Sequence, residues 1–356
     1  MQSLFKLQGI MKSTNNHKIV GLTFDVKEDY VLKESEPEDK YAEFDSLKTI
    51  GEITKAIEDS GHKVVSLGNA QRLLRLGKKP DVDIVFNIAE GLGGRNRESQ
   101  VPMLLELMDI PYVGADALTL GVTLDKIVAK QVFIAEGIPT PEFFQAKTIE
   151  DLKNLTLKFP LMVKPRYEGS SKGVDHGSLV RDESALEKRV SWLIEKYQQP
   201  ALIEEFILGK EFTVPIIGND PPKVYYPVQV EIEGKLELGD LFYTHGDIYS
   251  PDLEYVYPAQ ISKDLTKRIQ NRSLAAYRAV GCRDWGRVDV RVNEKDEIFI
   301  LELNPLPSLC SEDVFIKIAE YEGLGLSDIV GSILNAALKR YSMLNSKEKV
   351  ASSVKN

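Results

Sequence analysis

Short apolar segments alternate with amphipathic segments along the first third of the chain, and this alternation limits the fold more than any other feature of the sequence. Residues 18–24, 62–67 and 82–88 are apolar runs of the length of a buried strand. Residues 46–60 place their apolar side chains on one face of a helix, and residues 99–108 form a second helix. Strands that alternate with helices predict a parallel sheet with helices on its faces.

The remainder of the chain predicts a compact α+β unit and a further strand-rich region. Its expected elements are a helix over 123–137 that ends at Gly-Ile-Pro-Thr-Pro, a strand at 161–164, a glycine–serine loop at 169–173, a helix over 183–197, a strand at 201–206 and a helix over 263–280. We therefore predict a mixed α/β and α+β fold class. The expected domains are an N-terminal α/β domain over 1–118, a central domain over 119–206, a C-terminal domain over 207–340 and a frayed polar tail over 341–356.

Two further expectations concern loops and location. The acidic residues 27–43 are expected to form an unusually long surface loop.

The formal charge of −9 argues against nucleic acid or an anionic membrane as a partner. Two cysteines provide no disulfide framework, and no apolar run approaches the length of a membrane span. We expect a soluble cytoplasmic protein.

A late hairpin carries the pattern of a metal site. Residues 287–292 and 298–304 alternate charged and apolar side chains around a four-residue turn. This turn predicts that Arg287 lies opposite Glu302, with a core face made of Val288, Val290, Val292, Phe299, Leu301 and Leu303. The other face collects Arg287, Asp289, Glu302 and Asn304.

That second face has two readings. Two carboxylates and an amide oxygen are the hard ligands that hold Mg²⁺ through phosphate oxygens, and the arginine can neutralise developing negative charge. The alternative is an amphipathic hairpin with a solvated polar face.

Three other segments fit a nucleotide site, and each also has an ordinary structural reading. Lys164 ends a strand before a glycine–serine loop that can approach phosphate oxygens, although the loop lacks the P-loop ending and can also be a plain hairpin tip. Glu205 and Ile207 can offer backbone hydrogen bonds to adenine while Glu211 accepts from ribose, unless the segment is a solvated strand end. The third segment is the start of the helix that contains Lys126, whose ordinary reading is a lysine on the helix surface.

Together these motifs resemble the ATP-grasp ligases, and among them the D-alanine–D-alanine ligase family. The resemblance covers about residues 82–338. Its segments are Leu104–Gly114, Leu124–Lys126, Val163–Ser171, Leu202–Phe206 with Glu211–Thr213, Gly281–Asp289 and Leu301–Pro305. It implies a three-domain ATP-grasp architecture and an ATP-dependent ligase.

The resemblance also implies roles for individual residues. Lys126 and Lys164 are the expected ATP-phosphate lysines, and Ser170 and Ser171 lie in the loop that folds over the phosphates, with Ser171 and Arg287 as catalytic residues. The residues expected around adenine and ribose are Glu204, Glu205, Phe206, Ile207 and Glu211. Two Mg²⁺ or Mn²⁺ ions are expected on Asp289, Glu302 and Asn304. A carboxylate would form an acyl phosphate, an amine would then form the amide, and closure of the central domain would exclude water.

The substrate pockets depart from the family pattern. Residues 22–28 lack the family's glycine-rich segment with its glutamate, and the family's His-Gly loop is replaced by residues 87–100. The loop at 243–250 lacks the expected lysine. Ser308 stands where the family has a glycine, and Asp313 stands where it has a serine that binds the second substrate's carboxylate.

These departures predict a ligase with a substrate pair of its own. We expect Arg95, Arg97 and Glu98 to contact the carboxylate donor, with Glu28 as a weaker candidate. We expect Asp313 to contact a cationic or hydroxyl-bearing acceptor. A solvated loop is the alternative for both arginines. Two rival functions are a true D-alanine–D-alanine ligase of cell-wall synthesis and an ATP-binding regulatory protein without ligase chemistry. The family resemblance also implies a homodimer through the N-terminal domain.

Overall fold

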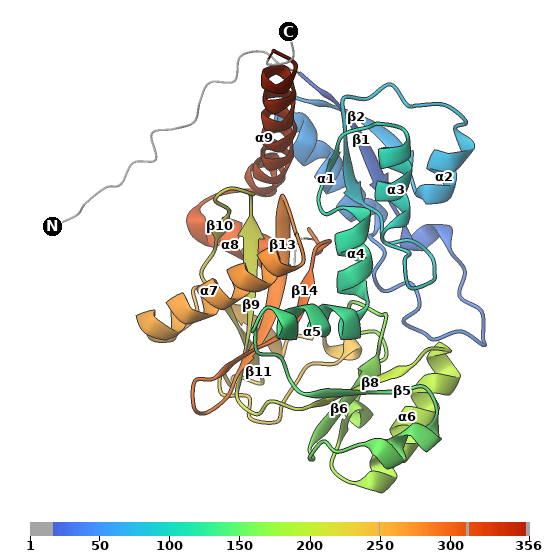
Figure 1. The fold of residues 1–356 in the computed structure, drawn as a ribbon, viewed down its shortest axis with the longest axis vertical. Coiled ribbons are helices and arrows are strands. Elements are labelled where there is room, and N and C mark those ends of the chain that lie inside the picture. The colour runs from blue at the N-terminus through green and yellow to red at the C-terminus, as the bar shows by residue number, and fades with distance from the viewer. Residues whose placement is uncertain (1–16, 249, 311–312, 354–356) are drawn as a thin grey trace, which may run out of the picture.

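Three β-sheets organise the computed structural model, which describes residues 17–353 except 249, 311 and 312. Figure 1 shows the N-terminal sheet, the central sheet and the C-terminal sheet as separate layers with helices packed around them. No helix within the described residues is long and apolar enough to cross a membrane.

The N-terminal sheet has the order β2-β1-β3-β4, and all its strands are parallel. Its strands are β1 (Ile19–Phe24), β2 (Lys63–Gly68), β3 (Ile84–Ile88) and β4 (Tyr112–Val113). Its helices are α1 (Leu47–Asp59), α2 (Ala70–Arg75) and α3 (Gln100–Leu107). Ser46 caps α1 by accepting the Thr49 N–H at 3.1 Å. The parallel α/β arrangement expected from the alternation is confirmed.

The central sheet is antiparallel and has the order β5-β8-β6-β7. Its strands are β5 (Phe143–Ala146), β6 (Leu161–Pro165), β7 (Leu179–Val180) and β8 (Ala201–Glu205). The helix α6 (Glu183–Tyr197) buries Leu186, Val190 and Leu193 against it. This burial follows the helical spacing of those residues.

The C-terminal sheet places the late hairpin at one edge, in the order β12-β11-β9-β13-β14 with β10 paired to β9. Its strands are β9 (Lys210–Ile217), β10 (Lys223–Val224), β11 (Val228–Ile232), β12 (Leu253–Val256), β13 (Trp285–Val292) and β14 (Ile298–Asn304). The helix α7 (Lys263–Ala279) packs on it.

The helix expected over 123–137 is interrupted, and that prediction is wrong at its start. The structure has α4 (Ala117–Leu124) and α5 (Lys126–Ala135), with a break at Asp125. The Asp125 side chain accepts the Val128 N–H and binds Arg166 at 2.6 and 2.7 Å. The Asp125 carboxylate therefore caps the start of α5, and its ion pair with Arg166 holds the chain at the break between the two helices.

The hairpin register also differs from the prediction. Arg287 lies opposite Asn304, rather than Glu302, and a bulge follows Asp289. The extra residue reverses the facing of β14 beyond the bulge. Ile298 and Ile300 consequently enter the core, whereas Phe299 and Leu301 do not. Arg287, Asp289, Glu302 and Asn304 still share the other face, because all four belong to the part of the hairpin on the near side of the bulge, where the pairing is regular.

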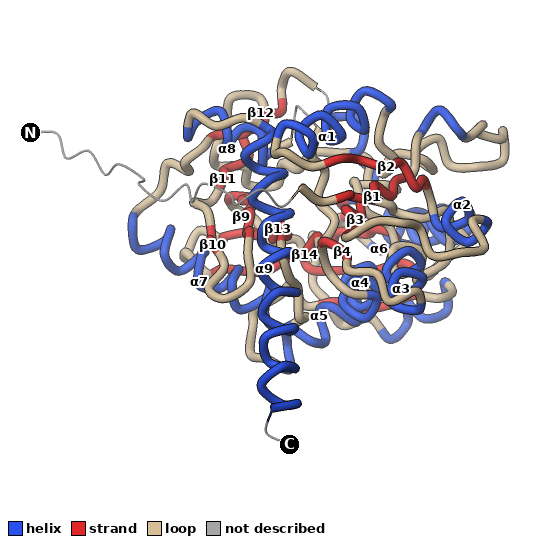
Figure 2. Tube along the Cα trace, turned by 90° about the horizontal axis from the view of Figure 1, so that it is seen from above, coloured by secondary structure: helices blue, strands red, loops and turns tan. Residues whose placement is uncertain are grey.

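The last two helices return to the N-terminal sheet. The helix α8 (Val314–Glu322) and the helix α9 (Leu326–Ser353) contribute to the same apolar cluster as α1 and β1. The backbone is helical through Ser353, so the frayed tail predicted from 341 is wrong over that stretch. The segment contains no glycine or proline that would end the helix. Figure 2 shows the end of α9 extending beyond the rest of the molecule.

Candidate active site

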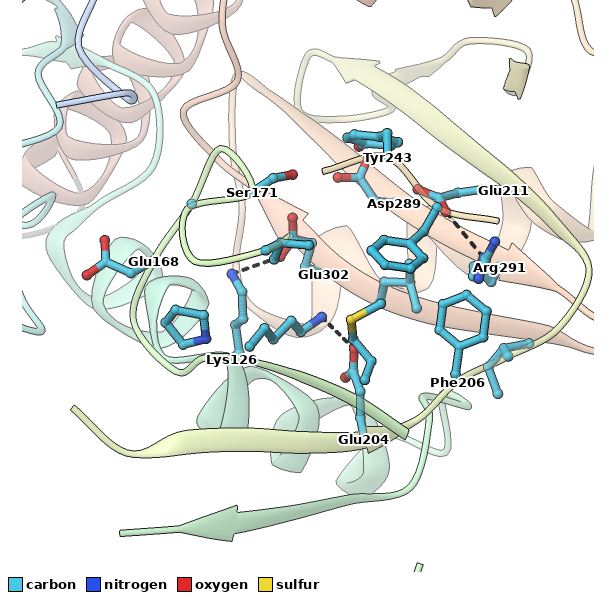
Figure 3. Close-up of a pocket in the computed structure, with 18 of the residues that line it drawn as sticks. Lys126, Glu168, Ser171, Glu204, Phe206, Glu211, Tyr243, Asp289, Arg291 and Glu302 are labelled. Carbon is cyan, nitrogen blue, oxygen red and sulfur yellow. Dashed lines mark ion pairs between the residues drawn. The ribbon is translucent and has the colours of Figure 1, made fainter. Parts of the chain in front are cut away.

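A cavity opens between the central and C-terminal sheets; it and the open solvent at its mouth amount to about 830 Å³. Ten of the predicted nucleotide and metal residues line it, namely Lys126, Lys164, Ser171, Glu204, Glu205, Phe206, Ile207, Glu211, Asp289 and Glu302. They come from α5, from five strands of two sheets, and from the loops between them (Figure 3). Long-range folding thus brings together residues that the sequence separates.

Two lysines are held at the cavity by carboxylates. The Lys126 Nζ lies 2.8 Å from a Glu302 oxygen, and the Lys164 Nζ lies 2.5 Å from a Glu204 oxygen. Lys130, which the sequence did not single out, lies 2.9 Å from the other Glu204 oxygen. Burial opposes ionisation of Glu204, but the two lysines outweigh it and lower its pKa to about 2. The site therefore carries fixed charges of both signs.

The metal-ligand candidates lie side by side on β13 and β14. Asp289 pairs directly with Glu302 across the hairpin, and the Asn304 amide donates to Asp289 at 2.9 Å. Thr213 on β9 donates to the other Asp289 oxygen at 2.7 Å. Burial opposes the charge on Glu302, but Lys126 and Lys164 lower its pKa to about 2. This oxygen-rich donor set fits a divalent cation such as Mg²⁺.

A second charged pair lies at the opposite end of the cavity. The Glu211 carboxylate lies 3.2 Å from Arg291 Nε, and the Arg291 guanidinium lies 4.3 Å from the centre of the Phe206 ring (Figure 3). Burial raises the pKa of Glu211. Sequence reasoning missed Arg291, although strand alternation places it on the same face as Arg287 and Asp289. Leu301 also lines this cavity, a position it owes to the bulge.

The glycine–serine loop lies over the cavity in a left-handed backbone conformation. Ser170 and Ser171 have φ of 47° and 53°, and Gly173 has φ of 71°. Ser171 lines the cavity, whereas Ser170 is exposed. The 243–250 segment contacts this loop, since the His245 N–H donates to the Val174 carbonyl at 3.1 Å. Tyr243 of the same segment lines the cavity.

The acidic segment 27–43 is a surface loop, as predicted, with residues 31–35 exposed, but its last residues dock on the glycine–serine loop. Asp39 accepts the Gly173 N–H at 2.7 Å and the Tyr197 hydroxyl at 2.8 Å. Glu43 accepts the Gly169 N–H at 2.7 Å. Two carboxylates of the N-terminal domain therefore bracket the glycine–serine loop. Both were missed by sequence reasoning.

A signal for this docking was present in the sequence. Tyr30, Tyr41 and Phe44 stack on one another with ring centres 5.0–5.6 Å apart. Aromatic residues spaced through an acidic stretch indicate a packed segment rather than a solvated one.

The substrate candidates divide into two groups. Arg97 is buried against Glu43 at 2.7 Å, and Glu98 is buried beside it. Arg95 is exposed and pairs with Asp125 at 3.0 Å. Glu28 instead lies at the start of α1, where it accepts the Leu47 N–H at 3.4 Å, and Ser308 is exposed and accepts the Cys310 N–H. None of the six substrate candidates, Asp313 included, is among the residues that line the nucleotide cavity.

Arg287 is held between two aspartates. It donates to both Asp289 oxygens at 3.1 Å, and its Nη1 lies 3.5 Å from Asp313. Asp313 also caps α8. Burial raises the pKa of Asp313 to about 6, although Arg287 opposes this shift. The predicted acceptor residue thus fixes the arginine next to the metal candidates.

Comparison with solved structures identifies the class of fold. The chain superimposes on a D-alanine–D-alanine ligase from Bacillus anthracis complexed with ATP, with a TM-score of 0.70 at 22% identity, covering 92% of this chain and 99% of that chain. It matches the VanG D-Ala:D-Ser ligase from Enterococcus faecalis with a TM-score of 0.70 at 20% identity, covering 90% and 100%. The fold is the ATP-grasp fold of these ligases, as predicted.

Sequence comparisons identify the family. The family model described as D-ala D-ala ligase C-terminus matches residues 132–335. A D-alanine–D-alanine ligase from Carboxydothermus hydrogenoformans is 33% identical over 306 residues, which cover 83% of this chain and 94% of that protein. The uncharacterized protein y4sG from Sinorhizobium fredii is 32% identical over 298 residues, which cover 81% and 87%. The chain belongs to the D-alanine–D-alanine ligase family, whose members are ATP-dependent C–N ligases.

Proposed function

We propose that this protein is an ATP-dependent carboxylate–amine ligase whose substrate pair differs from two molecules of D-alanine. The observation that carries the proposal is the joint placement of Lys126, Lys164, Asp289 and Glu302 around one cavity. Lysines beside a metal-binding carboxylate pair offset the charge repulsion that a carboxylate meets at a nucleotide phosphate. A protein that only binds ATP has no need for Arg287 as well.

The proposed roles follow the geometry of the cavity. Lys126, Lys164 and the loop with Ser170 and Ser171 hold the phosphates. Adenine lies against the strand end made of Glu204, Glu205, Phe206 and Ile207, and the ribose hydroxyls bind Glu211. Asp289, Glu302 and Asn304 hold two Mg²⁺ or Mn²⁺ ions, which would supply positive charge to the phosphate oxygens.

The proposed reaction has two steps. A donor carboxylate oxygen attacks the γ-phosphorus of ATP, so that ADP leaves and an acyl phosphate forms. The acceptor amine then attacks the acyl carbon, loses a proton and expels phosphate. Arg287 faces the oxyanion of this second step, and Ser171 lies in the loop that covers the phosphates.

Two features support a different substrate pair. Asp313 replaces an uncharged hydroxyl at the acceptor side, and it would repel an acceptor carboxylate. Arg97 and Glu98 provide charged groups on the donor side, with Arg95 near its edge. We further propose a homodimer in the cytoplasm, with residues 1–118, 119–206 and 207–340 as its three domains. A true D-alanine–D-alanine ligase is the second candidate, because relatives 33% identical bear that name.

The test is ADP release with Mg²⁺ across D- and L-amino acids, singly and in pairs, with amide products detected by mass. Turnover with a pair other than D-alanine supports the proposal. Turnover with D-alanine alone supports the second candidate. ATP binding without turnover by any acid contradicts both ligase functions.

A further inference from the structure

Three glutamates converge at the carboxyl edge of the N-terminal sheet, outside the nucleotide cavity. Glu90 follows β3, Glu98 precedes α3, and Glu43 precedes α1. One carboxylate oxygen from each lies within 4.8 Å of the others. The carboxyl edge of a parallel sheet is where α/β proteins place ligands.

Glu43 has no free acceptor capacity. Arg97 Nη2 donates to both of its oxygens at 2.7 and 3.0 Å. The Gly169 N–H adds a bond to Oε1 at 2.7 Å, and Lys172 Nζ adds one to Oε2 at 2.6 Å. A carboxylate offers about four acceptor sites, and these four contacts fill them.

Glu98 is in the opposite situation. Its residue is 7% exposed, yet its carboxylate makes no hydrogen bond and no ion pair with any residue in the described part of the chain. Glu90 is half-buried and, among the same residues, its carboxylate has no such partner either. A buried charge without a partner is costly, so such a pair calls for a cation.

The neighbouring cations are already occupied. Arg97 and Lys172 each form ion pairs with both Glu43 and Glu168. The group of four carboxylates and two cations therefore has a formal excess of two negative charges. Burial and mutual repulsion raise the pKa of Glu90 well above its ordinary range, and burial raises that of Glu98.

We propose that Glu90 and Glu98 bind the two ammonium groups of the carboxylate donor, which is a diamino acid. The inference rests on the proposed ligase function and names its donor class. Lys172 contacts Glu43 and also lines the nucleotide cavity beside Ser171, so the glutamates adjoin the phosphate loop, where a donor carboxylate must lie. Two free carboxylates match two ammonium charges.

A divalent metal is a poorer occupant. Glu43 is saturated and cannot be a ligand, which leaves two carboxylates. Two carboxylates provide at most four of the roughly six to eight oxygen ligands that Ca²⁺ takes. An ammonium group needs only hydrogen-bond acceptors, and the two free carboxylates provide these.

The donor can be tested before the acceptor is known, because hydroxylamine traps an acyl phosphate as a hydroxamate. We would compare 2,3-diaminopropionate and ornithine, as D and L forms, with alanine and norvaline, in which a hydrogen replaces the second amino group. The expected result is a kcat/KM at least tenfold higher for a diamino acid. Glu90→Gln and Glu98→Gln should each reduce this preference at least tenfold, whereas Glu58→Gln, at an exposed position on α1, should preserve it.

Each other outcome overturns the inference in a distinguishable way. Hydroxamate formation from neutral amino acids at equal or higher kcat/KM refutes the diamino acid and leaves the ligase function standing. A Mn²⁺ stoichiometry that falls by one in Glu98→Gln identifies a metal site instead. Hydroxamate from no acid, in a protein that still binds ATP, refutes the ligase function and the inference with it.

Discussion

Replacing Glu98 by glutamine should stabilise the substrate-free protein at high pH. Burial, with repulsion from Glu43 and partial relief from Arg97, raises the pKa of Glu98 from 4.5 to about 7. Because the folded state holds this proton more tightly than the unfolded chain, stability falls as the pH rises from about 4.5 through 7. The ionised carboxylate then costs the fold about 3 kcal/mol.

Glutamine carries no charge and removes that cost. Unfolding entropy for 356 residues corresponds to about 0.7 kcal/mol per degree, so Glu98→Gln should raise the melting temperature at pH 8 by roughly 4 °C. At pH 5 the wild-type carboxyl is protonated, and the gain should be about 1 °C or less.

Thermal melts of wild type, Glu98→Gln and the exposed control Glu58→Gln at both pH values measure this. A lower melting temperature for Glu98→Gln at pH 8 would show that the carboxylate has a favourable partner. An equal gain at both pH values would show that charge is not the cause.

Two further predictions concern the cavity and its loop. Asp39→Ala removes the acceptor for the Gly173 N–H and the Tyr197 hydroxyl, so hydrogen exchange in residues 169–173 should increase about tenfold and the KM for ATP should rise. The exposed control Asp29→Ala should leave exchange unchanged, and the same result for Asp39→Ala would refute its role in holding the loop. Glu302→Gln should lower the rate of ADP release by roughly 100-fold, because a metal-binding carboxylate is lost, while the circular dichroism spectrum stays that of the folded protein. A rate within about threefold of wild type would exclude Glu302 as a metal ligand.

The sequence predicts the sheets well where local pattern decides the structure. Alternation in the first third predicted the parallel sheet, since β1 and β3 are buried on both faces and α1 is buried on one. The polar face of the hairpin was predicted from strand periodicity alone. Its register was not, because strand alternation does not show where a bulge such as the one after Asp289 interrupts the pairing of β13 with β14.

Long-range contacts explain the remaining errors. The charges of residues 27–43 suggest solvent, yet Asp39 and Glu43 are bound by backbone N–H groups more than 120 residues away. Asp125 interrupts the predicted helix, and its partner Arg166 lies 41 residues further along the chain, just after β6. Neither partner is visible in local composition, so pattern reasoning missed the docking of the first segment and the break at the start of the second.

The transfer of ¹⁸O from the donor carboxylate tests the central claim most directly. A donor identified by the hydroxamate assay is labelled in its carboxylate, and the phosphate released with the amide is analysed by mass. Attack of the carboxylate on the γ-phosphorus predicts one ¹⁸O atom in each phosphate. Unlabelled phosphate, formed together with amide, would contradict the acyl-phosphate ligase.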